Sequence, residues 1–248
     1  MIKNIAFYHF FKPSGDLETI KDSLRQRMLN LGIRGSILLS KEEGINSFFA
    51  GPEDKVDIFI EFLLHSIQVK NPTFKVSFTD DIPFKRTLVK IKNEIVADPG
   101  PHHVDLENKP APYVSPEELD AWYAQGKDMV IIDTRNDYEF EMGRFKNAVH
   151  LGTKNFAEFE DDLKKVPEDW KNKTVVTFCT GGILCEKAAP LMAKLGFKDV
   201  YQLNGGILNY FERVGKSHYE GTCFVFDQRV ALDAQLNPIN TNYKKLGE

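Results

Sequence analysis

The start of the chain alternates between a short apolar run and a segment with helical spacing. Residues 5–11 are rich in aromatic and β-branched side chains and predict a strand that stops at Pro13. Ser14 is placed to cap a helix over 17–31, where apolar side chains recur every three or four residues, and Gly32 follows its end. The first fifty residues therefore open with a strand and a helix.

The next stretch repeats this order with an added hairpin. Residues 35–40 and 45–50 are strand-like and flank a polar loop, and a helix is predicted from about residue 53, with its apolar face running to Leu64. Alternating residues 74–78 predict another strand, and 88–92 predict a further one that closes the domain. The order β-α-β-β-α-β is typical of a ferredoxin-like α+β domain.

Prolines then mark a boundary in the chain. Five of them, together with Gly100, fall between residues 99 and 116 and interrupt any regular element. We therefore predict a ferredoxin-like domain over 1–97, a Pro-rich linker over 98–114, a second domain over 115–216 and a C-terminal extension over 217–248.

The second domain reads as an α/β fold with a parallel sheet. Ser115 is placed to cap a helix, and the apolar runs 129–133 and 174–178 predict buried strands. Helical stretches over 185–195 and 207–214 alternate with such strands. The predicted fold is thus a parallel-sheet domain that follows a ferredoxin-like one.

A cysteine stands directly after the strand over 174–178. Strand ends in parallel sheets form reactive crevices, and a loop that enters a helix presents several N–H groups to one point. Such a nest stabilises a thiolate and lowers its pKa from the ~8.5 of a free cysteine. We therefore predict a catalytic Cys179 in an active-site loop that continues through Thr180, Gly181, Gly182, Ile183, Leu184 and Cys185.

Composition narrows the function classes. The chain has 248 residues, a formal charge of -4 and three cysteines, so neither a disulfide framework nor a broad basic surface is predicted. No apolar stretch approaches the ~18 residues of a membrane helix, and no signal peptide is evident. We expect a cytoplasmic protein with no membrane or DNA partner. No nucleotide-binding glycine motif or metal-ligand cluster occurs, so no metal and no tightly bound cofactor are predicted.

A local group of cations is the exception to this acidic balance. Residues 84–92 contain Lys85, Arg86, Lys90 and Lys92 and no acid. If the segment is a strand, Lys90 and Lys92 share one face and can follow phosphates. These four residues are the candidate RNA-binding residues, although charge runs are usually only solvated surface.

Two sets of residues carry family resemblances. The cysteine loop, with Asp133, Arg135 and Glu139 upstream, resembles the active-site region of rhodanese-like domains. In that frame we expect Arg135 and Glu139 to form an ion pair under the loop and Asp133 to organise it. Further segments resemble the bacterial tRNA uridine hydroxylase family over nearly the whole chain, namely Arg34-Gly35, Glu43-Gly44-Ile45-Asn46, Phe84 to Val96 (Lys90 to Val96 in particular), Cys179 to Ile183 and Gly221 to Val230.

This resemblance implies a reaction and its partners. The family hydroxylates the wobble uridine of tRNA to 5-hydroxyuridine with molecular oxygen as co-substrate, so tRNA is the expected partner, through its anticodon region, and Cys179 is essential. The electron donor is not implied. Two features depart from the family: Leu184 stands where the loop usually has arginine, and the chain ends at Glu248 without a Cys-rich tail.

Three alternatives use the same loop. A phosphatase needs an arginine six residues after the cysteine, and that position is Cys185, which argues against it. A thiosulfate-type sulfurtransferase would carry sulfur as a Cys179 persulfide. A catalytically silent RNA-binding or regulatory module would follow if Leu184 marks a lost activity.

Overall fold

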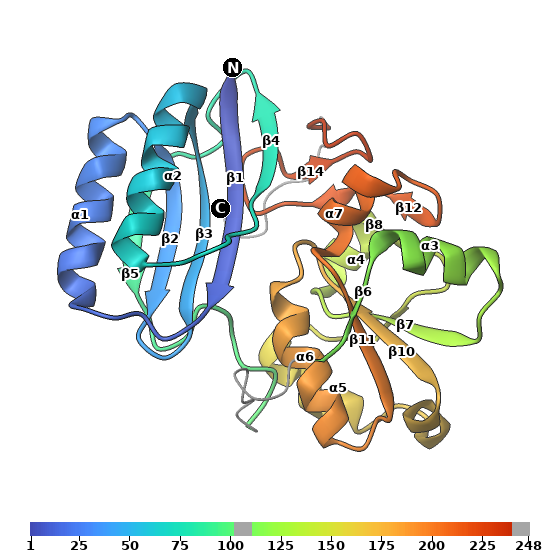
Figure 1. Cartoon of the computed structure of the whole chain (residues 1–248). Helices are drawn as coiled ribbons and strands as arrows, with labels where there is room; N and C mark the ends of the chain where they lie inside the picture. Colours follow the sequence, from blue (N-terminus) through green and yellow to red (C-terminus); the bar gives the residue numbers. More distant parts are fainter. Residues whose placement is uncertain (102–110, 240–248) are drawn as a thin grey trace. The chain divides into compact units, whose positions relative to one another are not determined.

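The chain folds into two compact units. The computed structural model describes residues 1–101 and 111–239, and the units span Met1–Val96 and Ala97–Glu248 (Figure 1). Each unit has its own hydrophobic core. We describe them one at a time.

The first unit is the predicted ferredoxin-like α+β domain with one added strand. Its five-stranded sheet has the order β4-β1-β3-β2-β5; β1 is antiparallel to both neighbours, and β5 lies parallel to β2. Asp16, rather than Ser14, caps the first helix, because its carboxylate accepts hydrogen bonds from the N–H groups of Glu18 and Thr19. The elements are β1 (Ile2–Phe10), α1 (Leu17–Asn30), β2 (Arg34–Ser40), β3 (Gly44–Pro52), α2 (Glu53–Ile67), β4 (Lys75–Thr79) and β5 (Thr87–Ile91).

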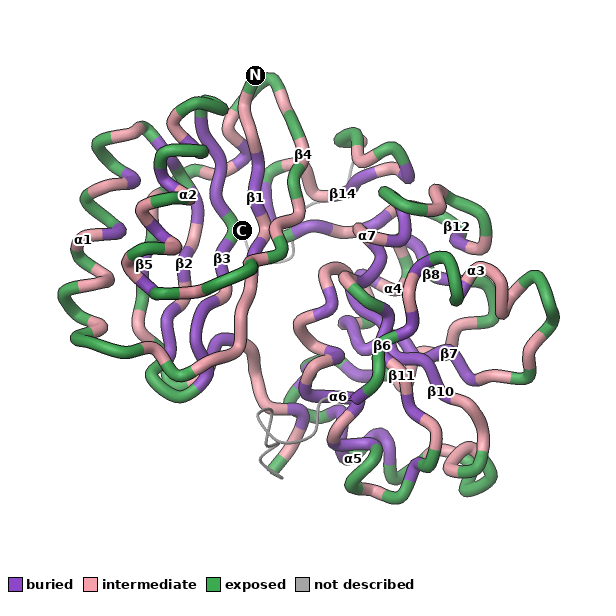
Figure 2. Tube along the Cα trace, in the orientation of Figure 1, coloured by how far each residue is buried: buried purple, intermediate pink, exposed green. Residues whose placement is uncertain are grey.

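Both helices of this unit cover the same side of its sheet (Figure 1). Strand side chains that point toward the helices, such as Ile5, Phe7 and Phe49, pack against Met28 of α1 and Phe59 of α2. Figure 2 shows the buried positions concentrated along the strands and on the inner sides of the helices. The other side of the sheet has no helix of this unit on it.

The second unit is built on a parallel sheet of order β6-β11-β10-β7-β9. A capping box between Ser115 and Glu118 starts its first helix, as the sequence predicted for Ser115. The strands are β6 (Tyr113–Val114), β7 (Met129–Asp133), β8 (Gly143–Phe145), β9 (Val149–His150), β10 (Thr174–Phe178), β11 (Asp199–Leu203), β12 (Tyr219–Gly221), β13 (Cys223–Phe224) and β14 (Ala231–Leu232). The helices are α3 (Pro116–Ala124), α4 (Asp137–Met142), α5 (Phe159–Leu163), α6 (Ile183–Lys194) and α7 (Gly206–Arg213), with 3-10 turns over Phe156–Glu158 and Glu168–Asn172.

Parts of the predicted linker and extension belong to this second unit. Within the linker range, β6 pairs with β11, and the N–H of Gln202 donates to the carbonyl of Pro112. This short strand escapes sequence analysis because its two residues show no periodicity. In the extension, β12 pairs with β8, and β13 pairs with β14. Residues 102–110 and 240–248 lie outside the described part.

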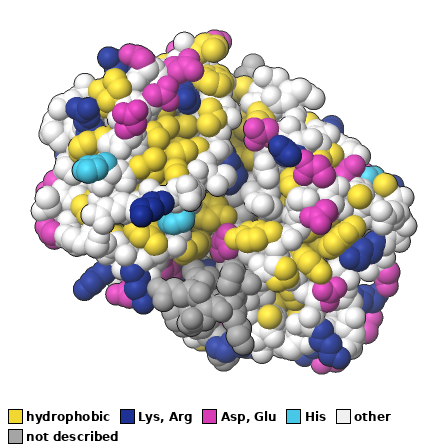
Figure 3. Space-filling model, in the orientation of Figure 1, with side chains coloured by type: hydrophobic (Ala, Val, Ile, Leu, Met, Phe, Trp, Pro, Cys, Tyr) yellow, Lys and Arg dark blue, Asp and Glu magenta, His cyan; other side chains and the backbone are white. Residues whose placement is uncertain are grey.

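The surface carries charges of both signs, and the helices are too short or too polar to span a membrane, as the composition predicted for the part of the chain that the structure describes. Cationic and anionic side chains are interspersed in Figure 3, with no broad field of one sign in that view. Among residues 1–101 and 111–239, none of the helices combines the length and apolar character needed to cross a bilayer.

Candidate active site

Cys179 lies at the carboxyl end of the central strand of the parallel sheet. β10 ends at Phe178, and α6 begins at Ile183, so the connecting loop is short. Gly182, the last residue before the helix, has a φ of 99°, a left-handed conformation that glycine adopts without the steric cost of a Cβ. This tight turn brings the first N–H groups of α6, which have no partner within the helix, back toward the cysteine.

Main-chain donors surround the sulfur of Cys179. The Gly182 N–H donates to Sγ at 3.1 Å, and the N–H groups of Gly181 and Leu184 also form hydrogen bonds with it. The side chain is buried, and burial by itself raises the pKa of the thiol. Hydrogen bonds from the Cys185 thiol and from the three N–H groups outweigh burial and lower the pKa from 9.0 to about 7. Near neutral pH a substantial fraction is therefore thiolate, the nucleophilic form.

Cys185 is the buried proton-bearing partner of this thiolate. It lies in the first turn of α6, fully buried, and its thiol forms a hydrogen bond with Cys179. Burial, and then the neighbouring Cys179, raise its pKa well above the usual value, so it remains protonated and donates. Thr134 Oγ1 lies 3.7 Å from the Cys185 sulfur. Cys185 thus both faces the core and contacts Cys179.

The beginning of α7 supports the loop from a second direction. The N–H of Ile207 donates to the Cys179 carbonyl at 3.0 Å, and that of Leu208 donates to the Thr180 carbonyl at 3.1 Å. A Cβ on Gly206 would lie 2.4 Å from the Cys179 carbonyl oxygen, so only glycine allows this approach. Sequence analysis did not single out Gly206. Its signal was the Gly205-Gly206 pair directly before the predicted helix over 207–214, which repeats the order of two glycines and a helix in the cysteine loop.

The predicted ion pair between Arg135 and Glu139 is wrong. Arg135 instead pairs with Asp133, with Nη2 to Oδ2 at 2.6 Å and Nε to Oδ1 at 2.9 Å, and it also donates to the Gly143 carbonyl at 2.6 Å. Asp133 and Arg135 are almost completely buried. Glu139 is the third residue of α4, and its carboxylate turns back to accept from the Asn136 N–H at 3.2 Å. Because its carboxylate forms a capping box with Asn136, Glu139 does not form the ion pair with Arg135 that the four-residue spacing predicted.

Glu139 is a second titratable group near the thiol. Burial raises its pKa from 4.5 to about 7, and the nearby Arg135 opposes that rise. The negative charge of Cys179 adds to it, so the two acids influence each other. Glu139 therefore exchanges a proton in the same pH range as the candidate nucleophile.

The remaining loop residues have structural partners. Thr180 Oγ1 donates to the Phe224 carbonyl at 3.4 Å, which ties the loop to the C-terminal extension. Ile183 begins α6, and Leu184, half-buried, packs against the core beneath the sheet. Leu184 therefore contributes its N–H and its packing, not a cationic side chain. Cys223 is fully buried, and burial raises its pKa to about 12, so it remains a neutral core thiol.

The predicted RNA-binding cations all lie in the first unit. Lys85 and Arg86 precede β5, Lys90 lies on it, and Lys92 directly follows it. All four are exposed. Lys90 sits opposite Leu38 in the register of β2 and β5, on the side of the sheet without helices. The strand places it there, whereas Lys92 lies beyond the strand end, so the predicted shared strand face does not extend to Lys92.

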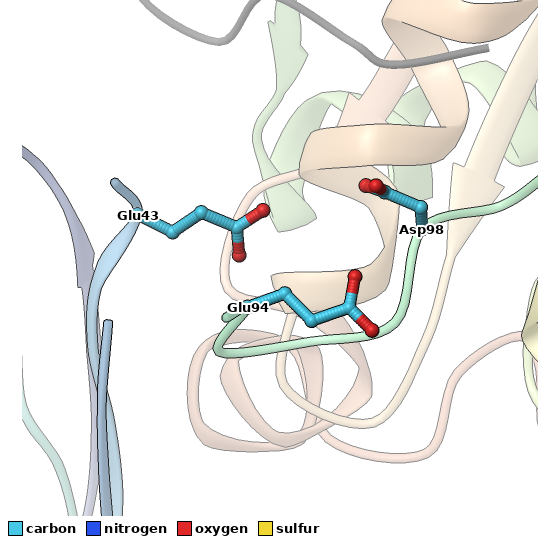
Figure 4. Close-up of side chains that lie close together, drawn as sticks. All are labelled: Glu43, Glu94 and Asp98. Carbon is cyan, nitrogen blue, oxygen red and sulfur yellow. The ribbon is translucent and has the colours of Figure 1, made fainter. Parts of the chain in front are cut away.

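Three carboxylates outside the loop have protein partners. Figure 4 shows Glu43, Glu94 and Asp98, the first two in the first unit and the third in the second. Glu43 Oε2 accepts from the N–H of Ile95 at 2.8 Å, and Asp98 Oδ1 accepts from Lys187 Nζ at 2.7 Å. We assign no metal ion to these groups.

Comparison with known proteins identifies both units. A family model described as a UPF0176 acylphosphatase-like domain matches residues 2–95, and a rhodanese-like domain model matches residues 115–213. Among solved structures, the rhodanese-like domain of an Anabaena protein is 17% identical, covers 55% of this chain and 92% of that one, and has a TM-score of 0.40.

Curated relatives match nearly the whole chain. A protein from Cupriavidus pinatubonensis is 44% identical over 96% of this chain and 85% of its own length. One from Legionella pneumophila (strain Lens) is 41% identical over 95% of this chain and 92% of its own length. A third, from Burkholderia cenocepacia, is 44% identical over 96% and 86%. All three carry the name tRNA uridine(34) hydroxylase.

Proposed function

The chain belongs to the tRNA uridine(34) hydroxylase family, which makes it an oxidoreductase that acts on tRNA, and we propose that it performs this hydroxylation through Cys179. The observation that supports the role of Cys179 is the set of hydrogen bonds that lowers its pKa to about 7 in a buried loop. A thiol with this pKa is ionised in substantial part at neutral pH, and the thiolate is the nucleophilic form. Of the three cysteines, only Cys179 has a lowered pKa.

The thiolate offers a direct way to activate the uracil ring. Cys179 adds to carbon 6, and the electron pair of the 5,6 double bond moves to carbon 5 as an enolate. The enolate reacts with molecular oxygen at carbon 5. An external reductant then supplies two electrons and two protons, so that one oxygen atom leaves as water. Loss of the carbon 5 proton and of the thiolate restores the double bond, and the product is 5-hydroxyuridine.

The residues around Cys179 serve specific parts of this sequence. The main-chain N–H groups of the loop stabilise the thiolate before addition and again when it leaves. Glu139, with a pKa of about 7, is suited to accept or return a proton close to the sulfur. The Asp133–Arg135 pair fixes the strand end and α4 beneath the loop. No metal and no tightly bound cofactor enter this proposal.

In this proposal the enzyme acts on the anticodon region of tRNA. Uridine 34 has to leave its stack with the neighbouring bases to reach a buried thiol. Lys85, Arg86, Lys90 and Lys92 would bind phosphates of the same molecule. Phosphate contacts make the affinity fall steeply with salt. We place the reaction in the cytoplasm, and the proposal includes no membrane or DNA partner.

Nucleoside analysis of tRNA tests the reaction and the nucleophile together. A strain that lacks this protein is complemented with the wild type, with Cys179→Ala or with Cys223→Ala. Cys223 is the matched control, since it is also a fully buried cysteine but has a raised pKa. We expect 5-hydroxyuridine with the wild type and with Cys223→Ala, and none with Cys179→Ala. Unchanged modification with Cys179→Ala would refute the proposed nucleophile.

Mass spectrometry of trapped enzyme and tRNA tests the addition step. A covalent adduct between Cys179 and uridine is expected under turnover, and its complete absence in an active enzyme would exclude addition to carbon 6.

Cyanolysis separates hydroxylation from sulfur transfer. A Cys179 persulfide would release thiocyanate on treatment with cyanide. We expect no such release from the enzyme that is active in hydroxylation.

A further inference from the structure

The side of the first sheet that carries no helix has an unusual set of side chains. Residues alternate between the two sides of a strand, and residues that face each other in the ladder share a side. Ile5 and Phe49 are paired and point to the helices, so Ala6 and its partner Phe48 point the other way. By the same register this second side carries three aromatic residues on the two adjacent strands β1 and β3: Tyr8, Phe10 and Phe48.

Phe48 is exposed in the middle of this surface. It lies on the central strand β3, the residue is 36% exposed, and its partners across the ladder are the small residues Ala6 and Ser36. Neither neighbour is large enough to cover the ring. Tyr8 is the diagonal neighbour, because it pairs with Asn46, two residues before Phe48. Diagonal neighbours lie about 7–8 Å apart, so the half-buried Tyr8 lies beside the exposed Phe48.

Cations surround these rings, and the same side has no acid on any of its strands. Arg34 on β2 and Lys90 on β5 are exposed there, and Lys75 on β4 places Nζ 5.2 Å from the centroid of the Tyr8 ring. The strand positions on this side carry no aspartate or glutamate. In a chain with a formal charge of -4, the charged strand positions on this side of the sheet are thus all cationic.

Within the first unit, the segment after β5 borders this surface. Asn46 Nδ2 donates to the Ile95 carbonyl at 3.1 Å, and Ser40 Oγ donates to the Asn93 carbonyl at 2.7 Å. This segment closes the end of the sheet near Ser40 and Asn46. Phe48, two residues farther along β3, keeps its exposure beside it.

We propose that this sheet surface, centred on Phe48 and Tyr8, binds unpaired bases of the tRNA substrate by stacking. Exposed aromatic rings on adjacent strands accept the faces of splayed bases, and neighbouring cations accept the phosphates. The proposal rests on the proposed function only for the choice of tRNA as the RNA. It assigns base contacts to β1 and β3 in addition to the phosphate contacts expected near β5.

The molecule contains a matched control for the central residue. Phe78 on β4 is 42% exposed, slightly more than Phe48, but it pairs with Lys3, whose ammonium group contacts Asp57 of α2. Phe78 therefore points to the helix side of the sheet. Replacing either phenylalanine by leucine keeps an apolar side chain at an exposed position, and only Phe48→Leu removes a ring from the proposed surface.

The test measures binding by the full-length protein with fluorescence anisotropy. The probes are a tRNA transcript with uridine at position 34, its isolated anticodon stem–loop, and a blunt RNA duplex of the same length as the stem–loop. We expect Phe48→Leu to weaken binding of the tRNA and of the stem–loop about ten-fold, the effect of losing one stacked base. Phe48→Tyr should restore binding, Phe78→Leu should match the wild type, and duplex binding should be the same in all variants.

Different results would overturn this proposal and the proposed function. Equal stem–loop affinity for Phe48→Leu and Phe78→Leu would refute the stacking surface, and so would equal losses for stem–loop and duplex. Neither result affects the Cys179 experiment. Conversely, if Cys179→Ala retained hydroxylation while Phe48→Leu lost stem–loop affinity, the nucleophile would be wrong and the RNA surface would stand. Equal thermal unfolding of the two leucine variants verifies that the comparison concerns binding.

Discussion

Removal of the Cys185 thiol tests how the fold ionises Cys179. The pKa of Cys179 lies about two units below its ordinary value of 9.0, despite complete burial. Cys185 contributes the largest of the hydrogen bonds that lower it. A hydrogen bond to a charged group contributes roughly 1.5–3 kcal/mol, which equals about one to two pKa units at 1.36 kcal/mol per unit. Cys185→Ala should therefore raise the pKa of Cys179 by at least about one unit.

A higher pKa of Cys179 in the Cys185→Ala variant means less thiolate at neutral pH. A cysteine is ionised above its pKa, so at pH 7 the thiolate fraction would fall from roughly one half to about one tenth or less. Cys185→Ser keeps a hydroxyl donor in the same place, and it should preserve part of the lowering. Cys223→Ala removes an equally buried thiol that does not contact Cys179 and should leave the pKa unchanged.

The assay is the pH dependence of alkylation by iodoacetamide, with mass spectrometry to locate the modified cysteine. The wild type and Cys223→Ala should show a midpoint near 7, and Cys185→Ala should show a midpoint shifted to higher pH. An unshifted midpoint in a folded Cys185→Ala protein would contradict the reasoning, because the N–H groups would then account for the ionisation by themselves.

Three further predictions concern the supports of the loop. Gly206→Ala should lose activity and stability, because its Cβ would lie 2.4 Å from the Cys179 carbonyl oxygen at a φ of 66°; thermal unfolding and modification assays measure both. Asp133→Asn leaves the buried charge of Arg135 without its partner and should cost about 3–5 kcal/mol in urea unfolding, and a loss below 1 kcal/mol would contradict a buried pair. Because folding raises the pKa of Glu139 from 4.5 to about 7, the wild type should lose about 3 kcal/mol as pH rises through that window, and Glu139→Gln should lack this loss when unfolding is followed from pH 4 to 8.

The sequence by itself was sufficient for the order of elements in the first unit, for two central strands and three helices of the second, and for the position of the candidate nucleophile. Apolar periods of two and of about 3.6 are local properties, and they placed each of these predicted strands and helices within a few residues. The arrangement of strand, cysteine, two glycines and helix is equally local. It follows from the chain alone that Cys179 stands where N–H groups of a starting helix converge.

The choice of partner for each side chain and the contacts between distant segments were decided only by the tertiary structure. Arg135 could pair with either of two nearby carboxylates by spacing, and the capping role of Glu139 left Asp133 as its partner. The support from Gly206 reaches the loop from 27 residues farther along the chain, across the sheet. The aromatic surface of the first unit likewise depends on the register between β1 and β3. Local periodicity reports which side of an element is buried, and it contains no information about which distant groups meet there.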